Sequence, residues 1–489
     1  MIKLNNANLA TLPADVARPT YDRSRITTGI VHFGVGGFHR AHQAMYLDRL
    51  MNKGEALDWG ICGVGVMPSD QRMRDALNSQ DGLYTLMVKH PDGHYEASVI
   101  GSIVDFLYAP DDPEAVLELM AAPSTRIVSL TITEGGYNFH HVTGEFDLGN
   151  ADVVHDLAAG AVPRTVFGLV TEALRRRRAR SIAPFTVMSC DNIQSNGDVA
   201  RKMFCAYAGA KDAELGDFIA SHVAFPNAMV DRITPVTTRE DVAEVARRFG
   251  IDDAWPVVCE PFTQWVVEDH FPLGRPAYEK VGVQMVADVV PYELMKLRLL
   301  NASHQALTYF GYLAGYRYAH EVTGNPLFAK FLLDYMTLEG TPTLSPVPGV
   351  DLDDYRRTLI ERFSNPEVRD TLARLCAESS DRIPKWLLPV IRCQLKAGGD
   401  ISRSAAVVAS WARYAEGTDE QGRPIEVVDR LKDRLMAIAA HNRDNPTAFI
   451  ENRELFGDLA DEPRFVAAYR EALASLHSAG ALETVRRYC

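Results

Sequence analysis

The chain has 489 residues, which is more than one ordinary hydrophobic core requires and favours two domains. Hydrophobic residues make up 47% and charged residues 24%, values typical of a folded globular protein. The formal net charge is -13, whereas a nucleic-acid-binding protein would present a basic surface. Nucleic acid is therefore not an expected partner.

The amino-terminal segment and the hydropathy pattern favour a cytoplasmic protein. Residues 1–11 are polar and lack the charged head and apolar centre of a signal peptide. No apolar run approaches the ~20 residues needed to span a bilayer, so we expect no membrane partner. The seven cysteines are scattered, odd in number and without a C-x-x-C pair, which predicts free thiols in a reducing compartment.

The first half of the chain alternates β-rich runs with helical stretches. Strands are expected at 29–33, 59–66, 126–132 and 185–189, and helices at 39–51, 69–78 and 161–178. Strands that alternate with helices predict a parallel, doubly wound sheet. This part of the chain is therefore assigned to the α/β class.

The second half reads as mostly helical. From about residue 291 onward, long stretches carry helical periodicity, and 292–314 is the longest uninterrupted one. The sequence S-N-P-E at 364–367 has the capping residue, proline and acid of a helix start. We predict an α/β nucleotide-binding domain over 1–285 and a mostly α-helical domain over 286–489.

The first predicted strand leads into a glycine turn at 34–42, G-V-G-G-F-H-R-A-H. Glycines at Gly34, Gly36 and Gly37 let a backbone approach a pyrophosphate, and the helix that begins near Phe38 supplies amide donors. The third glycine stands beside the second, so the full G-x-G-x-x-G motif is absent and a plain strand-to-helix turn is the alternative. Its position on the first strand of an α/β half favours a dinucleotide site.

Acidic residues follow three of the predicted strands. Asp70 comes after the second strand, where a carboxylate accepts hydrogen bonds from ribose hydroxyls and repels a 2′-phosphate, which favours NAD over NADP. The alternative is that Asp70 complements a helix dipole. Glu134 ends a further strand, where it would face the nicotinamide or a proton path, and the pair Asp191-Asn192 ends another, where it would form part of a ligand site. A loop acid and ordinary turn chemistry are the alternatives there.

Unusual polar residues interrupt the apolar stripe of the helix expected at 292–314. At about 100° per residue, Lys296, His304 and Asn301 fall near 0°, 80° and 140° on the helical wheel. Polar groups in an apolar stripe cost stability unless they are paired or face a cleft. The alternative to a site is a lysine that extends to solvent and two satisfied core residues.

Alcohol oxidation would give these side chains a common purpose. No H-E-x-x-H motif and no cysteine cluster is present, so a structural zinc is not expected, although scattered ligands leave a catalytic zinc open. Without a metal, a side chain must remove the hydroxyl proton, and a lysine of lowered pKa can do so. An amide can donate to the developing alkoxide, and a histidine can orient the hydroxyls.

Five stretches together resemble the polyol-specific long-chain dehydrogenases, and they occur in order over nearly the whole chain. They are residues 34–42, 133–137 (T-E-G-G-Y), 189–192 (S-C-D-N), 225–235 (F-P-N-A-M-V-D-R-I-T-P) and 296–304 (K-L-R-L-L-N-A-S-H). The resemblance implies a Rossmann-type amino-terminal domain, a helical carboxy-terminal domain and an active site in the cleft between them. It also implies NAD as cofactor and no catalytic metal.

The same resemblance implies roles for individual residues. Lys296 would be the general base, Asn192 and Asn301 would hold the alkoxide, and His304 would position the substrate. Further substrate contacts are implied, with looser matches, for Asp191, Asn227, Arg232, Arg374 and Arg382. For Arg382 a solvated surface charge is the alternative, and for Arg232 a structural ion pair with Asp231.

The activity implied by the resemblance is reversible, NAD-dependent oxidation of D-mannitol to D-fructose by a monomeric enzyme. Oxidation of D-arabinitol would need the same machinery. Reduction of fructuronate would add an arginine for the acid group, such as Arg374 or Arg382. A nucleotide-binding sensor on the same scaffold is the non-enzyme alternative, and the presence of Lys296 with both asparagines argues against it.

Overall fold

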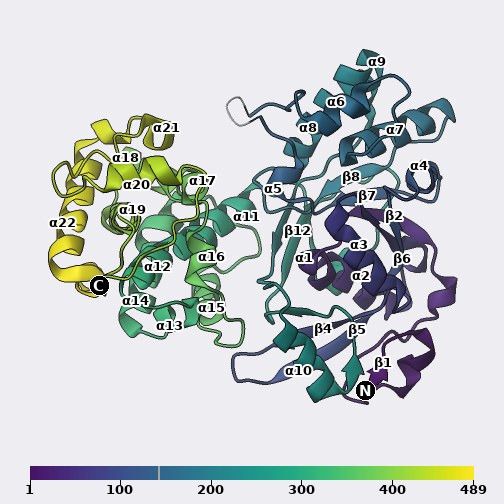
Figure 1. The fold of residues 1–489 in the computed structure, drawn as a ribbon, viewed down its shortest axis with the longest axis horizontal. Coiled ribbons are helices and arrows are strands. Elements are labelled where there is room, and N and C mark those ends of the chain that lie inside the picture. Colours follow the sequence, from purple (N-terminus) through teal and green to yellow (C-terminus); the bar gives the residue numbers. More distant parts are fainter. Residues whose placement is uncertain (141–143) are drawn as a thin grey trace. The chain divides into compact units, whose positions relative to one another are not determined.

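The computed structural model describes residues 1–140 and 144–489, and the chain divides into two units, Met1–Val289 and Val290–Cys489 (Figure 1). The seven cysteines lie in the described part and are free thiols. Among the described residues, no helix has both the length and the apolar character needed to cross a bilayer.

A five-stranded parallel sheet forms the centre of the first unit. Its strands stand in the order β6 (Ile103–Tyr108), β3 (Gly60–Gly65), β2 (Thr28–Phe33), β7 (Ile127–Leu130) and β8 (Thr186–Ser189). The chain moves outward from β2 through β3 to β6 and then returns to the other side of β2 for β7 and β8. The strand order therefore reverses between β2 and β7, which is where doubly wound sheets bind their ligands. The predicted α/β class is confirmed.

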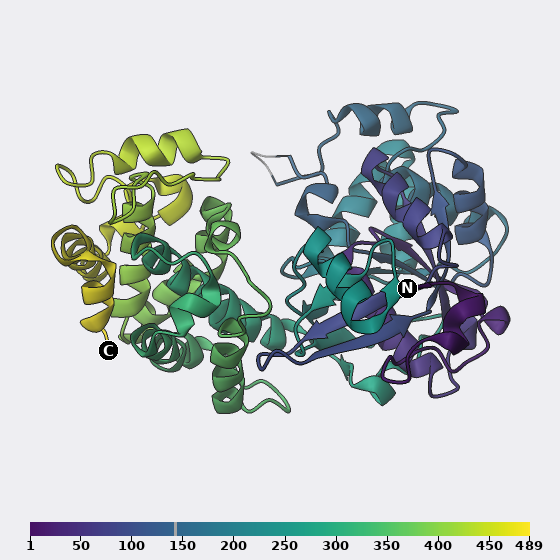
Figure 2. The same cartoon turned by 60° about the horizontal axis from the view of Figure 1, so that its bottom comes forward.

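Both faces of this sheet are covered, as the continuously apolar strands require. One face packs against α4 (Pro113–Ala121), α7 (Val166–Ala179), α8 (Asn196–Lys211) and α9 (Ala213–His222). The other packs against α2 (Gln43–Met51) and α3 (Gln71–Asn78) together with strands of two smaller sheets. Figures 1 and 2 show the central sheet enclosed in this way.

Three smaller sheets and short helices complete the first unit. The sheets join β11 (Val257–Cys259), β4 (Tyr84–Lys89) and β5 (Tyr95–Ile100); β13 (Gln284–Val286), β12 (Gln264–Glu268) and β9 (Ala228–Asp231); and β1 (Ile2–Lys3) with β10 (Ile251–Asp252). The remaining α-helices are α1 (Gly37–Ala41), α5 (Thr133–Gly136), α6 (Ala151–Leu157) and α10 (Arg239–Phe249).

The helix expected at 39–51 is broken near its start, so that prediction was wrong there. His42 separates α1 from α2, with φ -127° and ψ -90°. Tertiary hydrogen bonds take the place of the helical ladder: Arg232 Nη1 donates to Ala41 O at 2.7 Å, and His42 Nε2 bonds to Gln264 O at 2.8 Å. Because these partners are far away in the chain, the hydrophobic periodicity of 39–51 does not predict the break.

The second unit is helical, as predicted. Its α-helices are α11 (Val290–Met295), α12 (Ala302–Leu313), α13 (Ala319–Thr323), α14 (Pro326–Asp334), α15 (Leu352–Phe363), α16 (Leu372–Cys376), α17 (Ser379–Trp386), α18 (Leu388–Ala397), α19 (Ser402–Tyr414), α20 (Lys432–Ala439), α21 (Arg453–Phe456) and α22 (Pro463–Arg486). Helix α12 is buried on nearly all sides and packs against α13, α14, α16, α19 and α22.

Two segments of the second unit bond in the wider π-helical pattern. The first π-turn is Lys296–Asn301 and joins α11 to α12, and the second π-turn is Tyr335–Gly340 and follows α14 directly. In each, the residue after the turn donates its N–H to a carbonyl five residues back. Such turns are rare, and they often occur at functional sites.

The helix start expected at 364–367 is not present. Helix α15 ends at Phe363, and the Asn365 side chain accepts a hydrogen bond from the Glu367 N–H at 3.0 Å in an isolated turn. Arg369 then adopts a φ of +49°, which prevents helical continuation. The Asn365 side chain does cap a backbone N–H as expected, but the bond closes a turn and does not begin a helix.

Candidate active site

The glycine turn lies at the point where the strand order of the sheet reverses. Gly34 has a φ of +92°, and a Cβ there would lie 2.1 Å from Thr131 O. The Thr131 hydroxyl donates to Gly34 O at 2.7 Å and so ties the end of β2 to the end of β7. Gly34 therefore shapes the turn, because no other residue fits against the neighbouring strand.

The next two glycines leave room beside the backbone. A Cβ on Gly36 would meet no described atom closer than 3.8 Å, and one on Gly37 none closer than 3.6 Å. Phe38, the next residue, stacks on the His42 ring with centroids 4.9 Å apart. The turn thus offers an open stretch of main chain that an anionic group can approach.

Asp70 folds back over the carboxyl end of β3. Its Oδ2 accepts hydrogen bonds from the Val66 and Met67 N–H groups, both at 2.9 Å. A Cβ on Gly65 would lie 2.6 Å from Asp70 Cβ, so the glycine permits this close approach. No described residue bonds to Oδ1, which leaves that oxygen for a ligand hydroxyl. The position suits the predicted ribose contact.

The ends of β7 and β8 are joined through Asp191. Its buried carboxylate accepts from Ile132 N at 3.1 Å, Thr133 N at 2.8 Å and the Tyr137 hydroxyl at 2.9 Å. These bonds hold Thr133 at a φ of +64°, a conformation that costs a β-branched residue roughly 1–3 kcal/mol. Strain of this kind is maintained where the geometry of a site demands it.

This strained turn presents the predicted acid. Glu134 lies exposed on α5, one residue after Thr133. Asn192 lies exposed just beyond β8, directly after Asp191. Glu134 and Asn192 therefore both stand at the carboxyl edge of the sheet, while Asp191 braces the backbone beneath them.

The carboxyl of Asp191 should make stability depend on pH. Burial raises its pKa to about 6, although its three hydrogen bonds act in the opposite direction. The folded chain then binds this proton more tightly than the unfolded chain, whose aspartate has a pKa of about 3.9. Its stabilising contribution is complete below about pH 4 and is lost as the pH rises through 6.

Asp191→Asn removes this titration, so the variant should lose less stability than wild type as the pH rises through that window. The difference should reach up to about 3 kcal/mol, the value of a shift of roughly two units. Thermal unfolding followed at several pH values measures it. Identical pH dependence of the two proteins would contradict the assignment.

Asn227 and Arg232 are buried in the first unit, and each has hydrogen-bond partners within the protein. The Asn227 side chain accepts from Asp198 N at 3.0 Å, and its own N–H donates to Glu268. Arg232 donates through Nε and Nη2 to Glu260 O at 3.1 and 3.0 Å, besides its bond to Ala41 O. These bonds account for the burial of both side chains without a ligand.

Two predicted residues on the first π-turn and one on α12 are buried. Lys296, Asn301 and His304 are 7%, 3% and 8% exposed. The helical wheel put Lys296 and Asn301 about 140° apart, but that angle assumes α-helical bonding throughout. Bonding to the fifth residue widens the turn, so residues five apart come nearer to one face. Lys296 and Asn301 therefore lie closer to one face than the helical wheel predicts.

The buried amide of Asn301 has unused hydrogen-bonding capacity. Its Oδ1 has no hydrogen-bond partner among the described residues, and a buried polar atom of this kind calls for a ligand or a water. The His304 ring packs against Phe363 at a centroid distance of 4.5 Å, which fixes the ring plane. Glu293, also buried and one turn before Lys296, was not singled out from the sequence. The sequence feature that could have identified Glu293 is the presence of an acidic residue in the apolar stripe of this helix.

The two arginines expected to contact substrate lie on neighbouring helices of the second unit. Arg374 forms a two-point ion pair with Asp370, at 2.7 and 2.6 Å, on an exposed face. Arg382 donates to Leu375 O at 3.0 Å, and its guanidinium lies 5.6 Å from the centre of the Trp386 ring. Both therefore have structural partners, and their contact with substrate remains a prediction.

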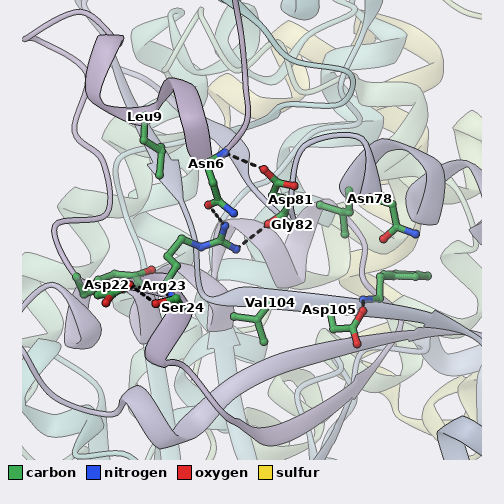
Figure 3. Close-up of a pocket in the computed structure, with 13 residues that line it drawn as sticks. Asn6, Leu9, Asp22, Arg23, Ser24, Asn78, Asp81, Gly82, Val104 and Asp105 are labelled. Atoms are coloured by element: carbon green, nitrogen blue, oxygen red, sulfur yellow. Dashed lines mark hydrogen bonds between the residues drawn. The ribbon is translucent and has the colours of Figure 1, made fainter.

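A surface pocket of about 620 Å³ in the first unit lies at the other edge of the sheet (Figure 3). Val104 and Asp105, at the start of β6, line it, whereas the glycine turn follows the end of the parallel strand β2. Arg23 crosses this pocket and donates to Asp81 O at 2.8 Å and Gly101 O at 3.0 Å. Its donors thus hold the amino-terminal segment in place.

Two family models match the chain. The mannitol dehydrogenase Rossmann domain matches residues 28–280, and the mannitol dehydrogenase C-terminal domain matches residues 288–477. Mannitol 2-dehydrogenase of Phaeosphaeria nodorum is 48% identical over 491 residues, which cover 100% of this chain and 86% of that one. Mannitol 2-dehydrogenase of Aspergillus fumigatus is 48% identical over 498 residues, which cover 100% and 99%.

Two solved structures are similar over nearly the whole length. The ternary complex of Pseudomonas fluorescens mannitol 2-dehydrogenase with NAD and D-mannitol has a TM-score of 0.89 and 48% identity, and the match covers 99% of each chain. A D-sorbitol dehydrogenase in substrate-free form has a TM-score of 0.91 and 39% identity, over 99% of this chain and 100% of that one. Both agree with the two-domain class predicted from the sequence.

Proposed function

The chain belongs to the mannitol dehydrogenase family, and from this premise we propose that it oxidises D-mannitol to D-fructose reversibly with NAD, using Lys296 as general base and no catalytic metal. The observation that carries the proposal is the burial of Lys296, Asn301 and His304 on and beside one π-turn. A lysine, an amide and a histidine can serve as the base, the hydrogen-bond donor and the orienting group in deprotonation of an alcohol.

The residues of the glycine turn fit a dinucleotide. The open backbone at Gly36 and Gly37 would hold the pyrophosphate, and the free Oδ1 of Asp70 would accept from the adenosine ribose. Glu134, at the strained end of β7, would stand on the nicotinamide side. When bound, NAD supplies the acceptor for the hydride.

The chain's own residues would carry out the proton chemistry. Lys296 takes the proton of the substrate hydroxyl as the general base. The amides of Asn301 and Asn192 donate to the oxygen as negative charge develops on it. His304, with its ring fixed against Phe363, orients the substrate hydroxyls. In the reverse direction Lys296 returns the proton to the carbonyl oxygen.

D-sorbitol is the second candidate substrate. The similarity to a D-sorbitol dehydrogenase extends over the whole chain, and the two polyols differ only in the orientation of one hydroxyl. D-arabinitol would use the same base and amides. Fructuronate would bring a carboxylate, and both arginines suggested for it already have partners in the second unit.

A substrate panel tests the proposal. Mannitol, sorbitol, arabinitol and fructose should be compared with fructuronate, each with NAD(H) and NADP(H), before and after exhaustive chelation. We expect the highest kcat/KM for mannitol with NAD and unchanged activity after chelation. Among the described residues, no group of three or more His, Cys, Asp or Glu side chains is placed to hold a metal ion. Loss of activity that zinc restores would overturn the metal-free part, and no turnover of any polyol would overturn the whole.

Asp70→Asn should change the choice of cofactor. Asparagine keeps an oxygen that accepts from the Val66 and Met67 N–H groups, but it removes the charge that repels a 2′-phosphate. We expect kcat/KM for NADP to rise about tenfold, the equivalent of about 1.4 kcal/mol, and that for NAD to fall by less. Steady-state kinetics with both cofactors measures it. An unchanged NAD-to-NADP ratio would assign Asp70 to turn capping alone.

A further inference from the structure

The two π-turns of the second unit pack against each other at their most unusual points. Tyr335 is the first residue of the second π-turn, and its buried hydroxyl donates to Arg298 O, inside the first π-turn, at 2.9 Å. Gly340 is the last residue of the second π-turn. A Cβ there would lie 2.9 Å from Leu299 Cδ2 and 3.3 Å from Arg298 O. Both ends of one turn therefore touch the centre of the other.

Arg298 O, which accepts the bond from Tyr335, lies where the π-turn changes the helical hydrogen-bond pattern. The N–H of Ala302 donates to Leu297 O, five residues back, so the helical ladder has slipped by one residue at this point. Arg298 O is the next carbonyl along the chain. A slipped ladder must return to α-helical bonding, and carbonyls at the transition need partners from outside the helix. Tyr335 supplies such a partner from 37 residues away.

We propose that Tyr335 is a positioning residue for the reaction, which acts by holding the first π-turn in the geometry that brings Lys296 and Asn301 to one face. The inference rests on the proposed function of these two residues. Without the hydroxyl, the π-helical arrangement loses one stabilising hydrogen bond, and α-helical bonding becomes the more stable alternative. That change would move Lys296 and Asn301 apart around the helix. A base displaced by about 1 Å loses on the order of a hundredfold in rate.

The surroundings of Tyr335 suit this role. Its side chain is fully buried, and burial raises the pKa of its hydroxyl well above the ordinary value. The hydroxyl therefore stays protonated and donates at every pH at which the protein is folded. On the far side of the second π-turn, the Glu339 carboxylate accepts from the Arg403 and Ser404 N–H groups at 2.7 and 2.8 Å. The second π-turn is thus anchored to the start of α19, so it forms a rigid support.

Tyr335→Phe tests the proposal because it removes one oxygen and keeps the ring. In the full-length protein, we expect kcat for D-mannitol to fall ten- to a hundredfold, while the Kd for NAD stays within twofold of wild type. The acid limb of the kcat–pH profile should also move, since the base sits in altered surroundings. Hydrogen exchange of backbone amides in the peptide spanning 296–303 should become at least tenfold faster.

Tyr309→Phe is the matched control. Tyr309 is fully buried on α12, and its hydroxyl bonds to the Ser379 side chain at 2.5 Å without reaching the first π-turn. It should lower the unfolding temperature as Tyr335→Phe does, but leave the pH profile and the exchange of 296–303 unchanged. Gly340→Ala places a methyl group against Leu299 of the first π-turn without removing a hydrogen bond. It should therefore reproduce the effects of Tyr335→Phe.

The outcomes separate this proposal from the function on which it rests. Faster exchange in 296–303 together with a normal kcat and pH profile would overturn the catalytic part, as would equal kinetic changes in Tyr309→Phe. Unchanged hydrogen exchange in 296–303 would overturn the proposal that Tyr335 holds the first π-turn. If wild type turned over no polyol, the proposed function would fail, whereas the exchange experiment would still decide whether Tyr335 holds the turn.

Discussion

Lys296→Ala is expected to lower kcat for D-mannitol by roughly 10²- to 10⁴-fold, the range that a positioned general base contributes. The Kd for NAD should stay close to wild type, because the proposed nucleotide contacts all lie in the first unit. The decline of kcat toward acid pH should disappear, since that decline reports protonation of the base. Rapid-mixing kinetics and NAD titration measure the two effects separately.

Two further variants keep this result specific. Lys296→Met fills the same space without the amine and should be as inactive as the alanine variant. Lys330→Ala removes an exposed lysine of α14 that pairs with Asp334 at 2.6 Å, and it should leave kcat unchanged. Small primary amines added to Lys296→Ala should restore part of the rate by entering the vacated space. A Lys296→Ala enzyme with near wild-type turnover would rule Lys296 out as the base.

The sheet was predictable because its residues carry the information locally. The runs at 29–33, 126–132 and 185–189 are apolar and rich in β-branched side chains, and each becomes a strand of the central sheet. Burial on both faces favours such runs, and their alternation with helices indicates the parallel arrangement. The strand order, and with it the switch point between β2 and β7, is seen only in the structure.

The geometry around Lys296 was not predictable in the same way. The sequence of 292–314 fits an uninterrupted α-helix, and no local pattern in it predicts π-helical hydrogen bonding. The π-turn is stabilised by a hydroxyl from Tyr335, whose distance along the chain hides it from any local pattern. The break at His42 has the same origin, because its partners are Gln264 on β12 and Arg232, which directly follows β9.

The glycine turn shows a third kind of limit. In the sequence, Gly34, Gly36 and Gly37 are equivalent members of one motif, whereas in the structure they do different things. Gly34 alone has a positive φ and a backbone neighbour where its Cβ would be. Gly36 faces open space. One glycine thus shapes the fold, and the other is free to serve a ligand.

Gly34→Ala should therefore destabilise the protein by about 2–5 kcal/mol. The left-handed conformation costs a residue with a Cβ about 1–2 kcal/mol, and overpacking costs about 1–3 kcal/mol more. The clash at 2.1 Å is with the carbonyl of Thr131, so no side-chain rotation relieves it. NAD binding should fall as well, because the turn opens. Urea unfolding of the full chain measures the loss, and a midpoint equal to wild type would contradict the strained geometry.

Gly36→Ala should give the opposite combination. Gly36 has a φ of -99°, which alanine adopts without strain, and its Cβ would meet nothing within 3.8 Å, so stability should stay within about 1 kcal/mol of wild type. The added methyl nevertheless occupies the space that a pyrophosphate would need, so NAD binding should weaken at least tenfold, or about 1.4 kcal/mol. Because the two variants differ only in which glycine gains a methyl group, a stable Gly36→Ala protein that binds NAD normally would place the cofactor elsewhere than on this turn.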